Sequence, residues 1–94
     1  MKLISISKSD AKGKKLKAVF EKDGKKKTIN FGAEGMDDWT LGATETQRKA
    51  YRARAIAGKT APADTASALS FHILWGDSRS RATNITAFKK KYNV

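Results

Sequence analysis

The segment from Thr65 to Trp75 constrains the fold most, because it is the longest stretch of the chain without a formal charge at neutral pH. It ends in the densest apolar cluster of the sequence, between Phe71 and Trp75. Charged residues make up 31% of the chain, so an uncharged, strongly apolar segment is expected to be buried. Leu69 and Ile73 are four residues apart, the spacing of one helix face. The sequence therefore predicts a buried helix around which the charged segments pack.

The length and composition favour one domain over residues 1–94. A chain of 94 residues is expected to bury roughly 60–65% of its unfolded surface in a single thin core. A hydrophobic content of 39% is typical of a globular protein and not of a disordered chain. The absence of cysteine excludes disulfides and thiolate zinc sites. The start M-K-L-I-S-I-S-K lacks the uninterrupted apolar region of a secretory signal, so we expect an intracellular protein without a membrane span.

The first third of the chain shows the two-residue period of strands. Apolar residues alternate with polar ones over Ile4–Ile6, Leu16–Phe20 and Ile29–Phe31, which indicates a sheet that is buried on one face. Asp23 and Gly24 separate the second and third strands and favour a two-residue hairpin, because both central positions of a type I′ turn require positive φ. We therefore expect a three-stranded antiparallel meander.

Two more helices are predicted beside the central one, which makes the fold class α+β. Thr44 or Thr46 can cap a helix from about Glu45 to Ala57 that Gly58 ends. A last helix is expected from about Thr83 to Tyr92. The residues expected to face inward are Tyr51, Ala55 and Ile56 on the earlier helix and Ile85, Phe88 and Tyr92 on the last.

The connection from Gly32 to Ala43 is punctuated by glycines and carries three acids, Glu34, Asp37 and Asp38. These carboxylates could bind a hard cation, but they lack the alternating pattern of an EF-hand loop. We favour acids that cap turns or neutralise nearby lysines, and no metal site. The apolar residues of this connection, Met36, Trp39 and Leu41, are expected to anchor it to the body of the domain.

The sequence carries no catalytic constellation. Gly58-Lys59-Thr60 resembles the end of a phosphate-binding P-loop, but Ala53 occupies the position of the required earlier glycine. His72 is the single histidine, without an Asp or Glu within four residues, and is expected to be structural. Asn84-Ile85-Thr86 matches a glycosylation sequon, which we interpret as residues at a helix start. We expect neither enzymatic activity nor a cofactor.

Positive charge is the strongest functional signal, since the formal net charge is +11 and the excess lies at the two ends of the chain. Such a balance favours nucleic acid or another polyanion as the partner. Lysine outnumbers arginine, and lysine contacts phosphate as a point charge, which indicates backbone contacts and not base reading. The residues expected to contact phosphate are Lys14, Lys15, Lys17, Lys25, Lys26, Lys27, Arg79, Arg81, Lys89, Lys90 and Lys91.

The order of several motifs resembles a family of small proteins of unknown function encoded by large DNA viruses of algae and protists and by marine viral and metagenomic sequences. The motifs are K-K-K-T-I-N-F-G, G-M-D-D-W-T, R-K-A-Y-R-A-R, T-A-S-A-L-S-F-H-I-L-W-G and the tail F-K-K-K-Y, within residues 16–94. The chain departs from the family pattern at Trp39, at Ser67 and at Ala55. The resemblance implies a viral context and no particular activity.

The favoured function is non-enzymatic, sequence-nonspecific binding to the nucleic-acid backbone, with DNA preferred. The resemblance adds viral genome packaging or a minor virion component, inside an infected cell or the virion, with other virion proteins as partners. The alternative is a protein-interaction or assembly module whose working surface is the segment from Met36 to Leu41, including Trp39. A small enzyme ranks third.

Overall fold

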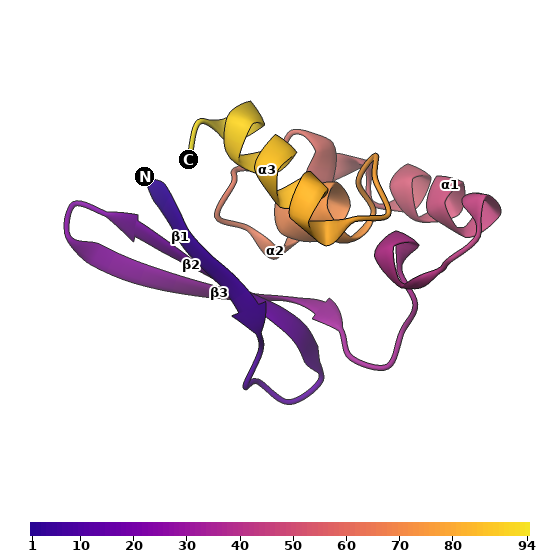
Figure 1. The fold of residues 1–94 in the computed structure, drawn as a ribbon, viewed down its shortest axis with the longest axis horizontal. Helices are drawn as coiled ribbons and strands as arrows, with labels where there is room; N and C mark the ends of the chain where they lie inside the picture. Colours follow the sequence, from indigo (N-terminus) through magenta and orange to yellow (C-terminus); the bar gives the residue numbers. More distant parts are fainter.

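The first third of the chain forms a three-stranded antiparallel sheet in the order β1-β2-β3, as the alternation predicts. In the computed structural model, which describes residues 1–94, the strands are β1 (Lys2–Lys8), β2 (Lys14–Lys22) and β3 (Lys25–Ala33) (Figure 1). Asp23 and Gly24 alone separate β2 from β3, with φ of 53° and 78°. Positive φ at both positions is the geometry of the expected hairpin turn, so that prediction is confirmed.

Strand β1 departs from simple alternation through a β-bulge. Leu3 lies opposite Phe20 and Ser5 lies opposite Val19, which leaves Ile4 as an extra residue in the ladder. Leu3 is consequently buried, whereas Ile4 is 45% exposed. The expectation that Ile4 belongs to the buried face was therefore wrong, because a bulge shifts the register that a two-residue period assumes.

The connection after the sheet leads through a 3-10 turn, η1 (Trp39–Leu41), into helix α1 (Glu45–Arg54). Thr44 caps α1 in a capping box with Gln47, which confirms the predicted start. The α-helix ends at Arg54, earlier than expected, and the chain continues as a 3-10 turn, η2 (Ile56–Lys59). Of the residues expected to face inward there, Ile56 is 57% exposed, because it lies on this turn and not on the helix.

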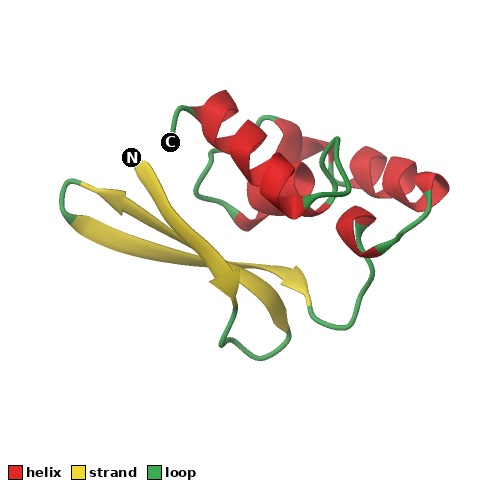
Figure 2. Cartoon of the chain, in the orientation of Figure 1, coloured by secondary structure: helices red, strands yellow, loops and turns green.

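The uncharged segment is helical and buried, as predicted. It begins as helix α2 (Ala66–Leu69), capped by Thr65, and continues as a π-helical turn, η3 (Ser70–Leu74). Helix α3 (Arg81–Tyr92) follows, with Ser80 as its N-cap (Figure 2). The structure thus confirms an α+β fold of three strands followed by three helices.

The helices cover one face of the sheet, and α1 extends away from it (Figure 1). Phe20 and Phe31 of the sheet pack in one core with Leu69 and Ile73 of the central helix and Phe88 of α3. This single core joins residues from both halves of the chain.

No helix of the protein combines the length and the apolar composition that a membrane span requires.

Candidate nucleic-acid interface

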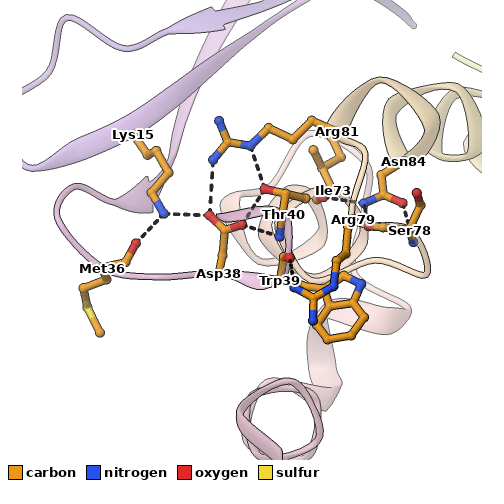
Figure 3. A network of polar contacts seen from close by, with 10 residues as sticks. All are labelled: Lys15, Met36, Asp38, Trp39, Thr40, Ile73, Ser78, Arg79, Arg81 and Asn84. Atoms are coloured by element: carbon orange, nitrogen blue, oxygen red, sulfur yellow. Dashed lines mark hydrogen bonds and ion pairs between the residues drawn. The ribbon is translucent and has the colours of Figure 1, made fainter. Parts of the chain in front are cut away.

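A buried carboxylate, Asp38, holds together the connection between β3 and α1 (Figure 3). The residue is 1% exposed, and its Oδ2 lies 2.7 Å from Lys15 Nζ and 3.2 Å from Arg81 Nη2. Its Oδ1 accepts a hydrogen bond from the Thr40 amide at 2.8 Å and another from the Thr40 hydroxyl. The Asp38 network, defined as Asp38 with Lys15, Thr40 and Arg81, joins β2, η1 and α3.

Opposing effects act on the pKa of Asp38. Burial by itself raises the pKa, whereas hydrogen bonds from Lys15 and Thr40 and the charges of Lys15 and Arg81 lower it. The lowering effects prevail, and the pKa lies below its usual value. The carboxylate is therefore ionised at neutral pH and neutralises cations, as expected of the acids in this connection.

The apolar residues of this connection do not anchor it in the expected way. Met36 is 65% exposed and Leu41 is 54% exposed. Trp39 is half-buried under the Arg79 guanidinium, whose carbon lies 3.6 Å from the ring centroid (Figure 3). The anchor is instead Asp38, because several hydrogen bonds to a buried carboxylate restrain the backbone on both sides of it.

Five of the side chains predicted to contact phosphate have partners within the protein. Lys15 and Arg81 belong to the Asp38 network, and Arg79 stacks on Trp39 while its Nη1 donates to the Trp39 carbonyl at 3.1 Å. The other two form surface ion pairs, Lys17 with Asp10 at 2.9 Å and Lys27 with Asp64 at 3.2 Å. Such exposed pairs are weak and can yield to a phosphate.

The other six predicted contact residues are exposed and form no ion pair: Lys14, Lys25, Lys26, Lys89, Lys90 and Lys91. Lys14 begins β2 and lies at the opposite end of the sheet from the hairpin turn. The other five occupy the hairpin and the last turn of α3. Positive side chains at a helix C-terminus also interact favourably with its dipole.

The hairpin and the last turn of α3 lie at the same end of the molecule, beside the two termini (Figure 1). The Leu3 amide donates to the Val94 carbonyl at 3.4 Å, which holds the end of the chain against β1. Within the hairpin, Lys25 pairs with Lys22 and Lys26 pairs with Glu21, so these neighbouring lysines lie on opposite faces of the sheet. We call Lys25, Lys26, Lys89, Lys90 and Lys91 the basic end.

Sequence reasoning missed the role of Asn84, which is the fourth residue of α3 and is 3% exposed. Its Nδ2 donates to the carbonyls of Ile73 and Ser78, at 2.8 and 2.7 Å, and its Oδ1 accepts from the Ser78 amide at 3.0 Å. Asn84 does lie in the first turn of α3, as expected, but Ser80 is the cap and the Asn84 side chain joins α3 to η3 instead. Asn84 lies four residues before the apolar Phe88 and so on the same helix face, and this spacing could have predicted that Asn84 is buried.

Comparison with known proteins places the chain in a family. A sequence profile described as "Family of unknown function (DUF5754)" matches residues 4–55, which include the whole sheet except its first residues and all of α1. "Uncharacterized protein L851" of Acanthamoeba polyphaga mimivirus is 42% identical over 80 residues, covering 77% of this chain and 80% of the viral protein. No solved structure matches the chain. The extent of these matches shows that the chain belongs to this family of unknown function, which has a member in a mimivirus.

Proposed function

We propose that the protein binds the phosphate backbone of nucleic acid without sequence preference, through the basic end. The observation that supports this function is the set of exposed, unpaired lysines that the hairpin and α3 place at one end of the molecule. Only five of the 20 lysine and arginine side chains form ion pairs. Acids of the protein therefore leave most of its positive charge available to an external polyanion.

The chemistry of the basic end favours electrostatic binding over base recognition. An ammonium group contacts phosphate as a point charge and lacks the planar fork with which arginine reads guanine. Each contacted phosphate releases counterions, so affinity falls as salt rises. If all five lysines of the basic end contact duplex DNA, the slope of log K against log salt is about −4.5. Duplex DNA is the preferred partner because its charge density is higher than that of single strands.

The mimiviral relative supports a biological setting for this activity. Packaged viral DNA requires positive counter-charge, and a small basic domain can supply it. We therefore include genome packaging or a minor virion role, in an infected cell or in the virion, in the proposal. The other virion proteins are partners in the same setting.

A charge-matched pair of variants tests the proposal. One carries Lys25→Gln, Lys26→Gln and Lys90→Gln in the basic end, and the control carries Lys8→Gln, Lys12→Gln and Lys49→Gln, which are also exposed and unpaired. Binding of the purified, nuclease-treated proteins to labelled duplex DNA, single-stranded DNA and RNA is measured over a range of salt concentrations. Both variants lose the same net charge, so only position distinguishes them.

We expect the basic-end variant to bind more weakly to every sequence and to lose about 2 to 3 units of salt slope, with less than about 1 unit lost in the control. Equal slopes in the two variants would show that net charge alone causes binding and would remove the basic end from the proposal. A wild-type protein that binds none of the three nucleic acids even at low salt would overturn nucleic-acid binding altogether.

Exposed apolar side chains favour a second candidate function, an assembly module. Met36 and Leu41 are more than half exposed on either side of Trp39, and the Trp39 Nε1 is buried without a hydrogen-bond partner. A protein partner that covers this segment would bury apolar surface, which stabilises association. If the oligomeric state or a virion-protein complex is lost in Met36→Ser with Leu41→Ser, and not in the basic-end variant, this function is favoured over the first.

A further inference from the structure

A cavity of about 340 Å³ lies where α1, η2, η3 and α3 meet, away from the hairpin. Three of its lining residues are cations from three separate elements, Arg52 of α1, Lys59 of η2 and Lys91 of α3. His72 of η3 also lines it. The volume falls at the lower end of the range for small-ligand sites.

Positive charge prevails in this cavity. Asp77 is the one acid among the lining residues, and its carboxylate is 98% exposed and lies 3.1 Å from Arg48. That pairing leaves Arg52, Lys59 and Lys91 without an ion-pair partner. A concave surface with unpaired cations is an attractive environment for an anion, because charges that converge on one point act together.

Two of the polar side chains are held in place before any ligand binds. Arg52 Nη1 donates to the Trp75 carbonyl at 2.8 Å, and its guanidinium carbon lies 4.2 Å from the centroid of the Phe71 ring. His72 Nε2 lies 3.0 Å from the Lys59 carbonyl, which can only accept, so Nε2 carries a proton. A fixed guanidinium and a fixed imidazole reduce the entropy lost on binding.

We propose that this cavity binds a phosphate group, either of a phosphate monoester or of an oligophosphate. Arg52 can contact two phosphate oxygens with its fork, while Lys59 and Lys91 approach as flexible point charges. The arrangement is not a P-loop, because Lys59 lies on a 3-10 turn that follows a helix and contributes its side chain, not a backbone cradle. The site goes beyond the proposed function, since it takes one phosphate group and not an extended backbone.

Two sources could supply this phosphate, a free nucleotide or the phosphorylated end of a nucleic-acid strand. Both present the same group to the same cations, and a cavity of about 340 Å³ has room for the phosphate and part of the attached sugar. The experiment therefore uses ligands of both kinds.

His72 is the single histidine of the chain and so provides an unambiguous reporter inside the cavity. Burial lowers its pKa, the hydrogen bond to the Lys59 carbonyl raises it, and the charges of Lys91 and Arg52 lower it further while Asp77 raises it. The balance leaves the pKa below its usual value. A phosphate dianion in the cavity stabilises the imidazolium, so binding must raise the pKa of His72.

The test records the His72 imidazole signals by NMR over a pH series, with four additions in turn: pyrophosphate, AMP, a 5′-phosphorylated oligothymidylate and the same oligonucleotide with a 5′-hydroxyl. A variant with Lys59→Gln and Lys91→Gln removes two cavity cations. The charge-matched control carries Lys12→Gln and Lys49→Gln, exposed residues that neither line the cavity nor belong to the basic end. The amide spectrum of each variant verifies its fold.

We expect pyrophosphate or AMP to raise the pKa of His72 and to bind about tenfold or more weakly to the cavity variant than to the control, as loss of charge-assisted hydrogen bonds implies. A response to the 5′-phosphorylated strand, and not to its 5′-hydroxyl form, would support the site with a strand end as the source. If none of the phosphates moves the His72 pKa at millimolar concentration, or if both variants weaken binding equally, the site is overturned. Lys91 belongs to both the cavity and the basic end, but the variants of the salt-slope comparison retain Lys59 and Lys91, so that comparison is decided separately.

Discussion

The Asp38 network and the basic end both carry positively charged side chains, yet the structure gives these side chains different surroundings. Lys15 is 12% exposed and lies 2.7 Å from a buried carboxylate, whereas Lys25 and Lys26 are exposed and have no acidic partner. In the Asp38 network the positive side chains hold the connection between β3 and α1 in place. In the basic end they are free for an external anion.

The physical difference is the cost of leaving a charge unpaired. A buried ion pair adds little to the free energy of unfolding compared with an apolar pair of the same shape. Removal of one partner is costly, because the other charge then stays buried without compensation for its lost hydration. A lysine in water carries no such penalty and can exchange one counterion for another. Burial therefore separates structural cations from cations that can bind a ligand.

The largest effect is expected from Asp38→Ala. This change leaves Lys15 and Arg81 without their carboxylate and removes the cap of η1, so the free energy of unfolding should fall by about 3 to 5 kcal/mol. Urea unfolding followed by circular dichroism measures the change. The neighbouring Asp37→Ala is the control, because Asp37 is exposed and should cost less than about 0.5 kcal/mol. Equal losses in both variants would contradict a special role for Asp38.

A smaller loss is expected from Asn84→Ala, the second buried polar centre. The Ile73 and Ser78 carbonyls and the Ser78 amide lose their partner, which should cost about 2 kcal/mol. The exposed Thr86→Ala on the same helix serves as control in the same unfolding experiment. A variant as stable as wild type would mean that water replaces the amide without penalty.

The pH dependence contributed by His72 should be smaller still. Its folded pKa is lowered, so the unfolded chain binds more protons than the folded protein at intermediate pH. The contribution to stability is therefore complete above the unfolded pKa of about 6.5 and decreases as pH falls through the folded pKa. Stability curves of wild type and His72→Gln between pH 7.5 and 5 should diverge in this direction. Parallel curves would exclude a folded pKa below the usual value.

The smallest effect on stability is expected from the basic-end variant with Lys25→Gln, Lys26→Gln and Lys90→Gln. These side chains have no partner in the protein, so the free energy of unfolding should change by less than about 0.5 kcal/mol, even though DNA affinity falls. Calorimetry measures the stability of the variant, and the binding assay measures its DNA affinity. A stability loss comparable with that of Asp38→Ala would contradict the conclusion that the lysines of the basic end have no structural role.

Local chemistry made much of the fold predictable. The Asp23-Gly24 turn, the capping box at Thr44 and the helical nature of the segment after Thr65 all depend on neighbours within a few residues. Ile4 was wrongly predicted to face the core, because a β-bulge inserts one residue into β1 and no local sequence pattern indicates that bulge. The hydrogen bonds of Asn84 were not predictable, because its partners, Ile73 and Ser78, come close to it only when η3 and α3 pack.

The candidate sites could be predicted from the sequence only in part. Their charge was evident, but neither the pairing of Lys15 and Arg81 nor the convergence of Arg52, Lys59 and Lys91 on one cavity has a local signature. Three elements must pack before those side chains share a space. The signal that did exist was a lone histidine within an uncharged helix, which now marks the wall of that cavity.

The amino-acid sequence by itself determined the strand alternation, the hairpin, the start of α1, the buried central helix and the excess of positive charge, because each follows from residue type and short-range spacing. Only the tertiary structure decided which cations are neutralised. Asp38 meets Lys15 across 23 residues and Arg81 across 43. An ion pair requires atoms within a few ångströms. The pairing of β2 with β3 brings Lys15 close to the connection that carries Asp38, and the packing of α3 brings Arg81 to the same carboxylate.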